Sequence, residues 1–86
     1  MNKYERIPEK VIDLHGHTIQ KSTHVLEELL TEQALSHVRI IVGKGTHSTK
    51  GPVLRDFVKE FFVLRNIRFA QSKINDGGEG ALEVYL

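Results

Sequence analysis

The sequence predicts an α/β fold, a two-layer sandwich in which a four-stranded mixed sheet carries two helices on one face. The chain has 86 residues, of which 40% are hydrophobic and 27% charged, the balance of one small globular domain. Apolar residues recur at strand spacing in four segments and at helix spacing in two. In chain order these segments form a β-α-β-α-β-β pattern, and two helices suffice to cover one face of such a sheet.

The first half of the chain provides two strands and one helix. Residues 1–9 are a polar lead-in, so the domain itself is expected to span residues 10–86. Lys10–Leu14 is rich in Val and Ile and predicts the first strand. A good N-cap followed by apolar residues at helical spacing predicts a helix over 18–36. Val38–Val42 predicts the second strand, because four of its five residues are Val or Ile.

The second half repeats this alternation and then ends in a hairpin. Pro52 stands where the first residue of a helix is expected, and the apolar pattern after it continues up to a C-terminal cap at Asn66. Ile67–Ser72 alternates as a strand does, residues 75–78 carry a turn signal, and Ala81–Leu86 alternates again.

The order of the elements predicts where a ligand binds. Right-handed crossovers leave the first three strands parallel, so all three end at the same edge of the sheet, whereas the fourth runs antiparallel. In open α/β sheets, ligands bind outside the carboxyl ends of the parallel strands. Three segments fall there, and together they hold all seven glycines: Asp13–Thr18, Gly43–Gly51 and Lys73–Gly80.

Charge and composition indicate which class of partner the chain binds and in which compartment it is expected. The net charge is only +1, but residues 34–75 hold eight Lys or Arg against two Asp or Glu. A basic middle between acidic ends favours a positive patch that binds a polyanion. The chain has no cysteine, which excludes a disulfide framework and favours the cytoplasm, and its apolar runs are too short to span a membrane.

The first loop at the predicted edge carries acid–base chemistry. Asp13 and His15 alternate at a strand end, so their side chains are expected on the same face. A carboxylate beside an imidazole fixes the tautomer of the ring and tunes it for proton transfer. His17 follows in the turn, and Thr18 begins a helix whose free N–H groups favour a phosphate. The alternative is that Asp13 caps the turn and His15 is a spacer.

The second loop has the composition of a phosphate-binding segment. Residues 43–51 contain two lysines, one histidine, three hydroxyl side chains and three glycines, with no apolar side chain. Backbone N–H groups and lysine charge can wrap around a phosphodiester in such a loop, although the spacing of a Walker A motif is absent. A plain solvated loop is the alternative.

These motifs resemble the signatures of the Smr (small MutS-related) domain family. The resemblance rests on three segments in the same order and spacing: Asp13–Thr18, Ile40–Gly45 and Gly77–Val84. It implies a β-α-β-α-β-β sandwich, and a domain that nicks or binds DNA or RNA, alone or fused to larger proteins that include a MutS paralogue and ribosome-rescue factors. Many family members carry His before Gly-x-Gly, whereas this chain has Val42, and His47 is the candidate to replace that imidazole.

The leading hypothesis is an endonuclease that cleaves phosphodiester bonds in RNA or branched DNA, with Asp13, His15 and His47 as catalytic residues. The alternative is a non-catalytic module that docks on nucleic acid or on the ribosome. A third reading is a metal-dependent hydrolase that uses Asp13, His15, His17 and His47 as ligands. We expect no obligatory cofactor, with Mg²⁺ or Mn²⁺ as the candidate ions. The expected nucleic-acid contacts are His17, Thr18, Gly43, Lys44, Gly45, Thr46, Ser48, Lys50, Arg55 and Lys73.

Two further residues are predicted to have structural roles. His37 is expected at the end of the first helix, at the surface or as a cap, and Tyr85 is expected to be a surface tyrosine on the polar side of the last strand.

Overall fold

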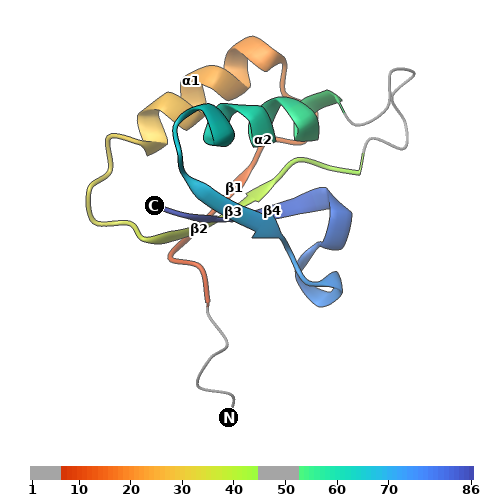
Figure 1. Cartoon of the computed structure of the whole chain (residues 1–86). Coiled ribbons are helices and arrows are strands. Elements are labelled where there is room, and N and C mark those ends of the chain that lie inside the picture. Colours follow the sequence, from red (N-terminus) through yellow and green to blue (C-terminus); the bar gives the residue numbers. More distant parts are fainter. Residues whose placement is uncertain (1–6, 45–52) are drawn as a thin grey trace.

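The computed structural model describes residues 7–44 and 53–86 and has the predicted β-α-β-α-β-β order (Figure 1). Both helices lie on one side of the sheet, which confirms the two-layer architecture. Two short 3₁₀ turns, η1 and η2, separate the last two strands. The elements are β1 (Lys10–Asp13), α1 (Ile19–Leu29), β2 (His37–Ile41), α2 (Val53–Leu64), β3 (Arg68–Gln71), η1 (Ile74–Asp76), η2 (Gly78–Gly80) and β4 (Ala81–Tyr85).

The last strand of the chain lies inside the sheet. The strand order is β1-β2-β4-β3, with β1 parallel to β2 and β4 antiparallel to both β2 and β3. It follows that β1, β2 and β3 run in the same direction and end at the same edge, as the connections predicted. Because β4 is inserted between β2 and β3, β1 and β3 are the two outermost strands of the sheet.

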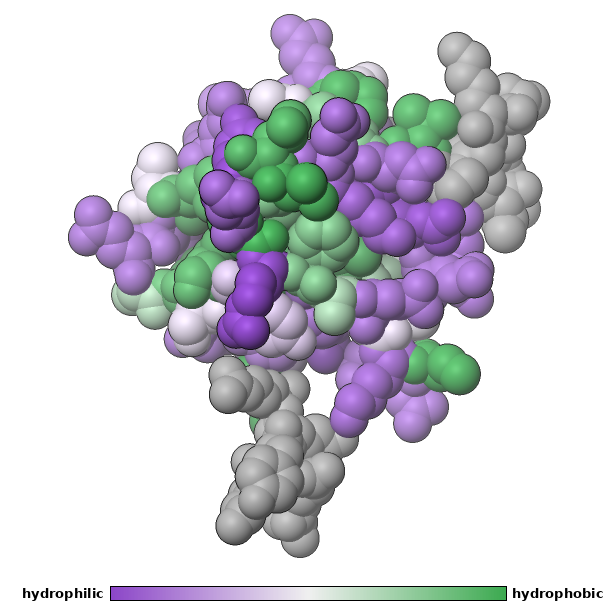
Figure 2. Space-filling model, viewed as in Figure 1, coloured by the Kyte–Doolittle hydropathy of each residue, from purple (hydrophilic) through white to green (hydrophobic). Residues whose placement is uncertain are grey.

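The hydrophobic core lies between the sheet and the two helices. The β2–β4 register pairs Val38 with Val84 and Ile40 with Leu82, and all four side chains are fully buried. Phe62 of α2 is also fully buried against them. In the space-filling view, hydrophobic groups gather around the two helices, whereas the side where β3 runs into the 3₁₀ turns is mainly hydrophilic (Figure 2). Among the described residues, no helix is long and apolar enough to cross a membrane.

The two helices end in different ways. Helix α1 stops at Leu29, seven residues before the predicted end at 36, because the N–H and the hydroxyl of Thr31 both donate to the Glu28 carbonyl and close the last turn. Helix α2 ends as the sequence predicted. Asn66 takes a left-handed conformation (φ 57°), and its N–H and that of Ile67 donate back to the carbonyls of Val63 and Phe62.

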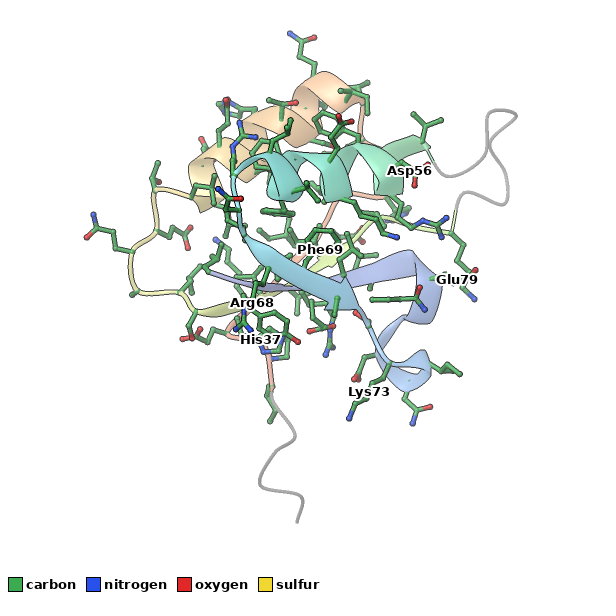
Figure 3. All side chains as sticks on the ribbon, viewed as in Figure 1. His37, Asp56, Arg68, Phe69, Lys73 and Glu79 are labelled. Carbon is green, nitrogen blue, oxygen red and sulfur yellow. The ribbon has the colours of Figure 1, made fainter. Side chains whose placement is uncertain are left out.

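The face of the sheet away from the helices carries a buried, hydrogen-bonded charge cluster. Glu83 of β4 accepts hydrogen bonds from His37 Nε2 (2.6 Å) and Arg39 Nε (2.7 Å), and from the Ser72 hydroxyl. His37 is 6% exposed and Glu83 8%. The prediction that His37 caps a helix at the surface was therefore wrong. Because α1 ends early, His37 is the first residue of β2, and its ring faces the partner strand (Figure 3).

The pKa of Glu83 is lowered by its partners. Burial of the carboxyl raises the pKa, but the hydrogen bonds from Ser72, Arg39 and His37 together outweigh that effect. A lowered pKa in the folded state means that the ionised group stabilises the fold above the pKa of the unfolded chain. That stabilisation is lost as the pH falls through the lower, folded value.

We predict that Glu83→Gln destabilises the domain by about 2 to 4 kcal/mol at pH 7, because it removes the buried charge that Arg39 pairs with at 2.7 Å and leaves Arg39 only the longer contact with Asp76 at 3.6 Å. The difference from the wild type should shrink as the pH falls through the lowered pKa of Glu83, since the wild-type carboxyl then also becomes neutral. Urea unfolding at pH 7 and at a pH below that lowered pKa measures this. Glu27→Gln on the exposed side of α1 is the control, and it should leave the free energy of unfolding nearly unchanged. An equal loss of stability in Glu83→Gln at both pH values would contradict the charge argument.

Candidate functional site

The carboxyl end of β1 holds an exposed carboxylate–imidazole pair. His15 Nδ1 lies 2.6 Å from Asp13 Oδ1, and the backbone N–H of His15 donates to the same oxygen at 3.0 Å. An Asp side chain that bonds the backbone two residues on is a common turn, which explains why the Asp-x-His spacing is enough to position the ring. The side chains stay accessible, with 51% of Asp13 and 70% of His15 exposed.

The geometry assigns the roles of the two nitrogens of His15. The pKa of Asp13 is lowered, first by the hydrogen bond from the His15 ring and then by the His15 backbone N–H, so the carboxyl is ionised at neutral pH. An ionised carboxylate only accepts hydrogen bonds, so the proton of this bond resides on Nδ1. In the neutral ring, Nε2 then keeps its lone pair and can accept a proton from a bound substrate.

The segment after His15 turns sharply into helix α1. Gly16 has a φ of +77°, and the N–H of His17 donates to the Leu14 carbonyl at 2.9 Å, which closes the turn. Thr18 is the N-cap of α1, and its hydroxyl accepts from the Lys21 N–H at 3.1 Å. The capping role of Thr18 agrees with the sequence prediction and places the start of α1 directly beside the Asp13–His15 pair.

Glycines allow the end of β2 and the turn before β4 to pack close to the Asp13–His15 pair. The N–H groups of Val42 and Gly43 donate to the Gly80 carbonyl at 2.8 and 3.0 Å. A Cβ atom on Gly43 would lie 3.5 Å from His15 Cβ, and one on Gly80 would lie 3.4 Å from Lys44 Cγ. The ends of β1 and β2 and the turn before β4 therefore meet closely, and the exposed Lys44 side chain passes over Gly80.

The loop that leads to β4 needs glycine for a steric reason. Gly77 has a φ of +123°, and a Cβ atom there would lie 2.7 Å from Ala81 Cβ, closer than packed atoms approach. Its N–H also closes η1 by bonding to the Ile74 carbonyl. The Gly77-Gly78 pair thus lets the chain fold tightly before β4.

The remaining predicted contacts separate into three groups. Arg55 lies in the first turn of α2, which starts at the same carboxyl edge. Lys73 follows β3, so it also lies at the carboxyl edge. Because β1 and β3 are the two outermost strands, Lys73 is three strand spacings, or about 14 Å, from the end of β1. The others lie outside the described residues: Gly45, Thr46, His47, Ser48 and Lys50.

No three His, Asp or Glu side chains among residues 7–44 and 53–86 are grouped closely enough to hold a metal ion. The third reading, in which Asp13, His15, His17 and His47 act as ligands, includes a residue beyond this part of the chain. The pair that the structure does bring together is Asp13 with His15.

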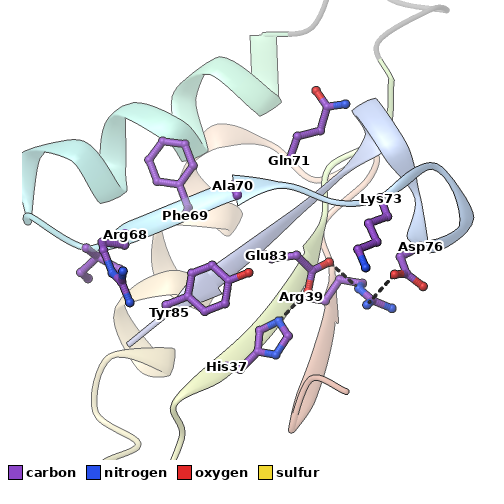
Figure 4. A pocket seen from close by; sticks show the side chains of 11 residues that line it. His37, Arg39, Arg68, Phe69, Ala70, Gln71, Lys73, Asp76, Glu83 and Tyr85 are labelled. Carbon is purple, nitrogen blue, oxygen red and sulfur yellow. Dashed lines mark hydrogen bonds and ion pairs between the residues drawn. The ribbon is translucent and has the colours of Figure 1, made fainter. Parts of the chain in front are cut away.

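A second polar site, which the sequence did not predict, lies on the open face of the sheet (Figure 4). It is a hollow of about 740 Å³ above β3 and β4, and it borders the buried Glu83 cluster. Arg39 and Glu83 lie 44 residues apart, and only the strand register brings them together. The sequence signal that could have shown this site was strand alternation. His37 and Arg39 of β2, and Glu83 and Tyr85 of β4, alternate with buried core residues, so they lie on the other face of the sheet.

Comparison with known proteins identifies the family. The sequence profile of the Smr domain matches residues 12–86. The chain belongs to the Smr domain family.

Individual relatives and solved structures are also similar to this chain. The chain is 37% identical over 78 residues to the endonuclease MutS2 of Carboxydothermus hydrogenoformans, covering 87% of this chain and 10% of that protein. It is 38% identical over 58 residues to an uncharacterised protein of Treponema pallidum, covering 64% of this chain and 29% of that protein. The crystal structure of the Smr domain of Thermus thermophilus MutS2 superposes with a TM-score of 0.76 at 29% identity, covering 90% of this chain and 96% of that one. The chain thus spans about a tenth of the length of the MutS2 relative and less than a third of the length of the Treponema relative.

We predict that His15→Ala raises the pKa of Asp13 part of the way to its ordinary value, because the ring bond is lost while the backbone N–H bond remains. Carboxyl ¹³C NMR titration of this Smr domain measures the change directly. His17→Ala, which removes only the smallest of the effects that lower the pKa of Asp13, is the control and should shift that pKa less. An unchanged Asp13 titration in His15→Ala would show that the 2.6 Å contact does not form in solution.

Proposed function

We propose that this Smr domain is an endonuclease that cleaves phosphodiester bonds, with RNA as its preferred substrate. The observation that carries the proposal is the exposed Asp13–His15 pair, held at 2.6 Å beside Gly43 at the carboxyl edge of the sheet. The name of the similar MutS2 protein, an endonuclease, supports the same reaction class. The cytoplasm is its proposed location, since the chain lacks cysteine.

The proposed reaction uses the 2′-hydroxyl of RNA as the nucleophile. His15 Nε2 accepts the proton of the 2′-hydroxyl, the 2′-oxygen attacks phosphorus, and the bond from phosphorus to the 5′-oxygen breaks. The leaving 5′-oxygen takes a proton from a general acid, for which His47 is our candidate. The products are a 2′,3′-cyclic phosphate and a 5′-hydroxyl, so the mechanism does not require water as a nucleophile.

Asp13 and Lys44 have supporting roles in this mechanism. The Asp13 carboxylate keeps the proton on Nδ1 and stabilises the imidazolium that forms when Nε2 takes up the second proton. Lys44 is exposed and passes over Gly80, and its ammonium group can neutralise the charge that develops on the phosphate oxygens. DNA lacks the internal nucleophile, so we expect its cleavage to be slower and to depend on an added divalent ion such as Mg²⁺ or Mn²⁺.

One observation favours a second candidate function, a module that binds nucleic acid or the ribosome without cutting. Val42 occupies the place where many Smr domains carry histidine, and its side chain is 95% buried in the core. That position therefore supplies no imidazole to the site. Whether His47 replaces it decides between the enzyme and the binding module.

We predict that the domain cleaves single-stranded RNA in excess chelator and leaves a 2′,3′-cyclic phosphate, detected by gel mobility and mass spectrometry of a labelled oligonucleotide. His15→Ala and Asp13→Asn should each lower the rate by about 10²-fold or more, and His47→Ala by about tenfold or more. His24→Ala, on the outer face of α1, is the matched control and should cut at the wild-type rate.

Binding measured on the same variants separates the two candidates. Because Asp13→Asn keeps the shape of the side chain and removes its charge, the variant should still bind RNA as the wild type does. Binding with no cleavage in the wild type would support the docking module, and wild-type cleavage rates in both the Asp13 and His15 variants would rule out this pair as the active site.

A further inference from the structure

The hollow on the open face is lined by one small side chain, Ala70, among larger ones. On β3 and just after it, Arg68, Ala70 and Ser72 face away from the helices, and Ala70 pairs in register with Glu83 of β4. The short Ala70 side chain leaves a gap between its larger neighbours. The resulting volume of about 740 Å³ lies within the range of pockets that bind small molecules or single nucleotides.

An aromatic ring forms one wall of the hollow. Tyr85 stacks on His37 with 5.1 Å between ring centroids and an interplanar angle of 25°, which fixes the orientation of the tyrosine. The Arg68 guanidinium lies 5.8 Å from the Tyr85 centroid on the β3 side (Figure 4). His37 covers one face of Tyr85 and the exposed Arg68 guanidinium lies over the ring, so a base enters between Tyr85 and Arg68 as the arginine moves outward. Both tyrosine rings and guanidinium groups stack on nucleobases.

The charges around the hollow favour an anionic ligand. Both of its carboxylates are paired with Arg39, Glu83 at 2.7 Å and Asp76 at 3.6 Å. Arg68 and Lys73 are exposed on its rim and pair with no acidic side chain in the described part of the chain. The lining thus carries three cations, Arg39, Arg68 and Lys73, against two carboxylates, a net charge of +1 that favours an anion.

The hollow and the proposed active site lie on either side of one segment, and the Tyr85–Arg68 wall of the hollow is at the end of the strands away from the carboxyl edge. The segment from Lys73 to Gly80 separates them: its Asp76 contacts Arg39 in the hollow, while the Gly80 carbonyl binds Gly43 beside His15. A nucleic acid strand at one site can thus reach the other across this segment.

We propose that the hollow holds an unpaired base of a single-stranded nucleic acid, with its flanking phosphates on Arg68 and Lys73. The inference rests on the proposed function, since it names the form of nucleic acid that the Asp13–His15 site receives. Stacking on Tyr85 needs a base whose face is free, which a duplex does not offer. The hollow therefore selects single strands over double strands.

The test measures binding rather than cleavage. The probe is a fluorescently labelled 12-nucleotide 2′-O-methyl oligouridine, which cannot form a cyclic phosphate, and a duplex of equal length is compared with it by fluorescence anisotropy. Ala70→Leu narrows the hollow at its floor without changing charge, and we expect it to weaken single-strand binding about tenfold while leaving duplex binding unchanged. Lys73→Glu should also weaken it by about tenfold, and the matched Lys59→Glu, on α2 across the sheet, should not.

The outcomes separate this inference from the proposed function. Wild-type affinity in both Ala70→Leu and Lys73→Glu, with loss in Lys44→Glu, would overturn the hollow but leave the active site standing. No binding of any nucleic acid by the wild type would overturn both. Capture of an acidic peptide in place of the oligonucleotide would assign the hollow to a protein partner. Lys73→Glu changes only an exposed position, so it keeps the test decisive if Ala70→Leu fails to fold.

Discussion

The pairing of β2 with β4 is the interaction on which the rest of this domain depends. The strand ladder continues past the strand ends, because the N–H groups of Val42 and Gly43 both donate to the Gly80 carbonyl. On one face the same register buries the core, and on the other it brings Glu83 against Arg39. At its end it sets the glycine turn beside His15. One ladder thus supports the core, the charge cluster and the candidate active site together.

The carboxyl edge of the sheet and its open face have different properties and different proposed roles. At the carboxyl edge the groups are exposed and suited to proton transfer, and their geometry is set locally by a turn in which Asp13 binds the His15 backbone. On the open face His37 and Glu83 are buried and paired with each other, so they hold β2 and β4 in register, and His37 orients Tyr85. The segment from Lys73 to Gly80 contacts both regions, which is why a single strand of nucleic acid can be proposed to engage both.

Local rules predicted what is local in this chain. The Asp13–His15 contact, the Thr18 cap and the Asn66 helix end each depend on residues within a few positions, and all three are found in the structure. The open-face hollow depends on β4 lying between β2 and β3, which no local pattern specifies. His37 was misplaced for the same reason: its position in a strand follows from an early end of α1 and from a partner 46 residues away.

The central claim is that nucleic acid is bound at the carboxyl edge, beside Asp13 and His15. The most direct measurement is an NMR titration of the ¹⁵N-labelled domain with the non-cleavable oligouridine. The account predicts the largest chemical-shift changes at the backbone amides of His15, Gly43, Lys44 and Gly80. Changes confined to the outer surfaces of α1 and α2, with these four amides unmoved, would contradict it.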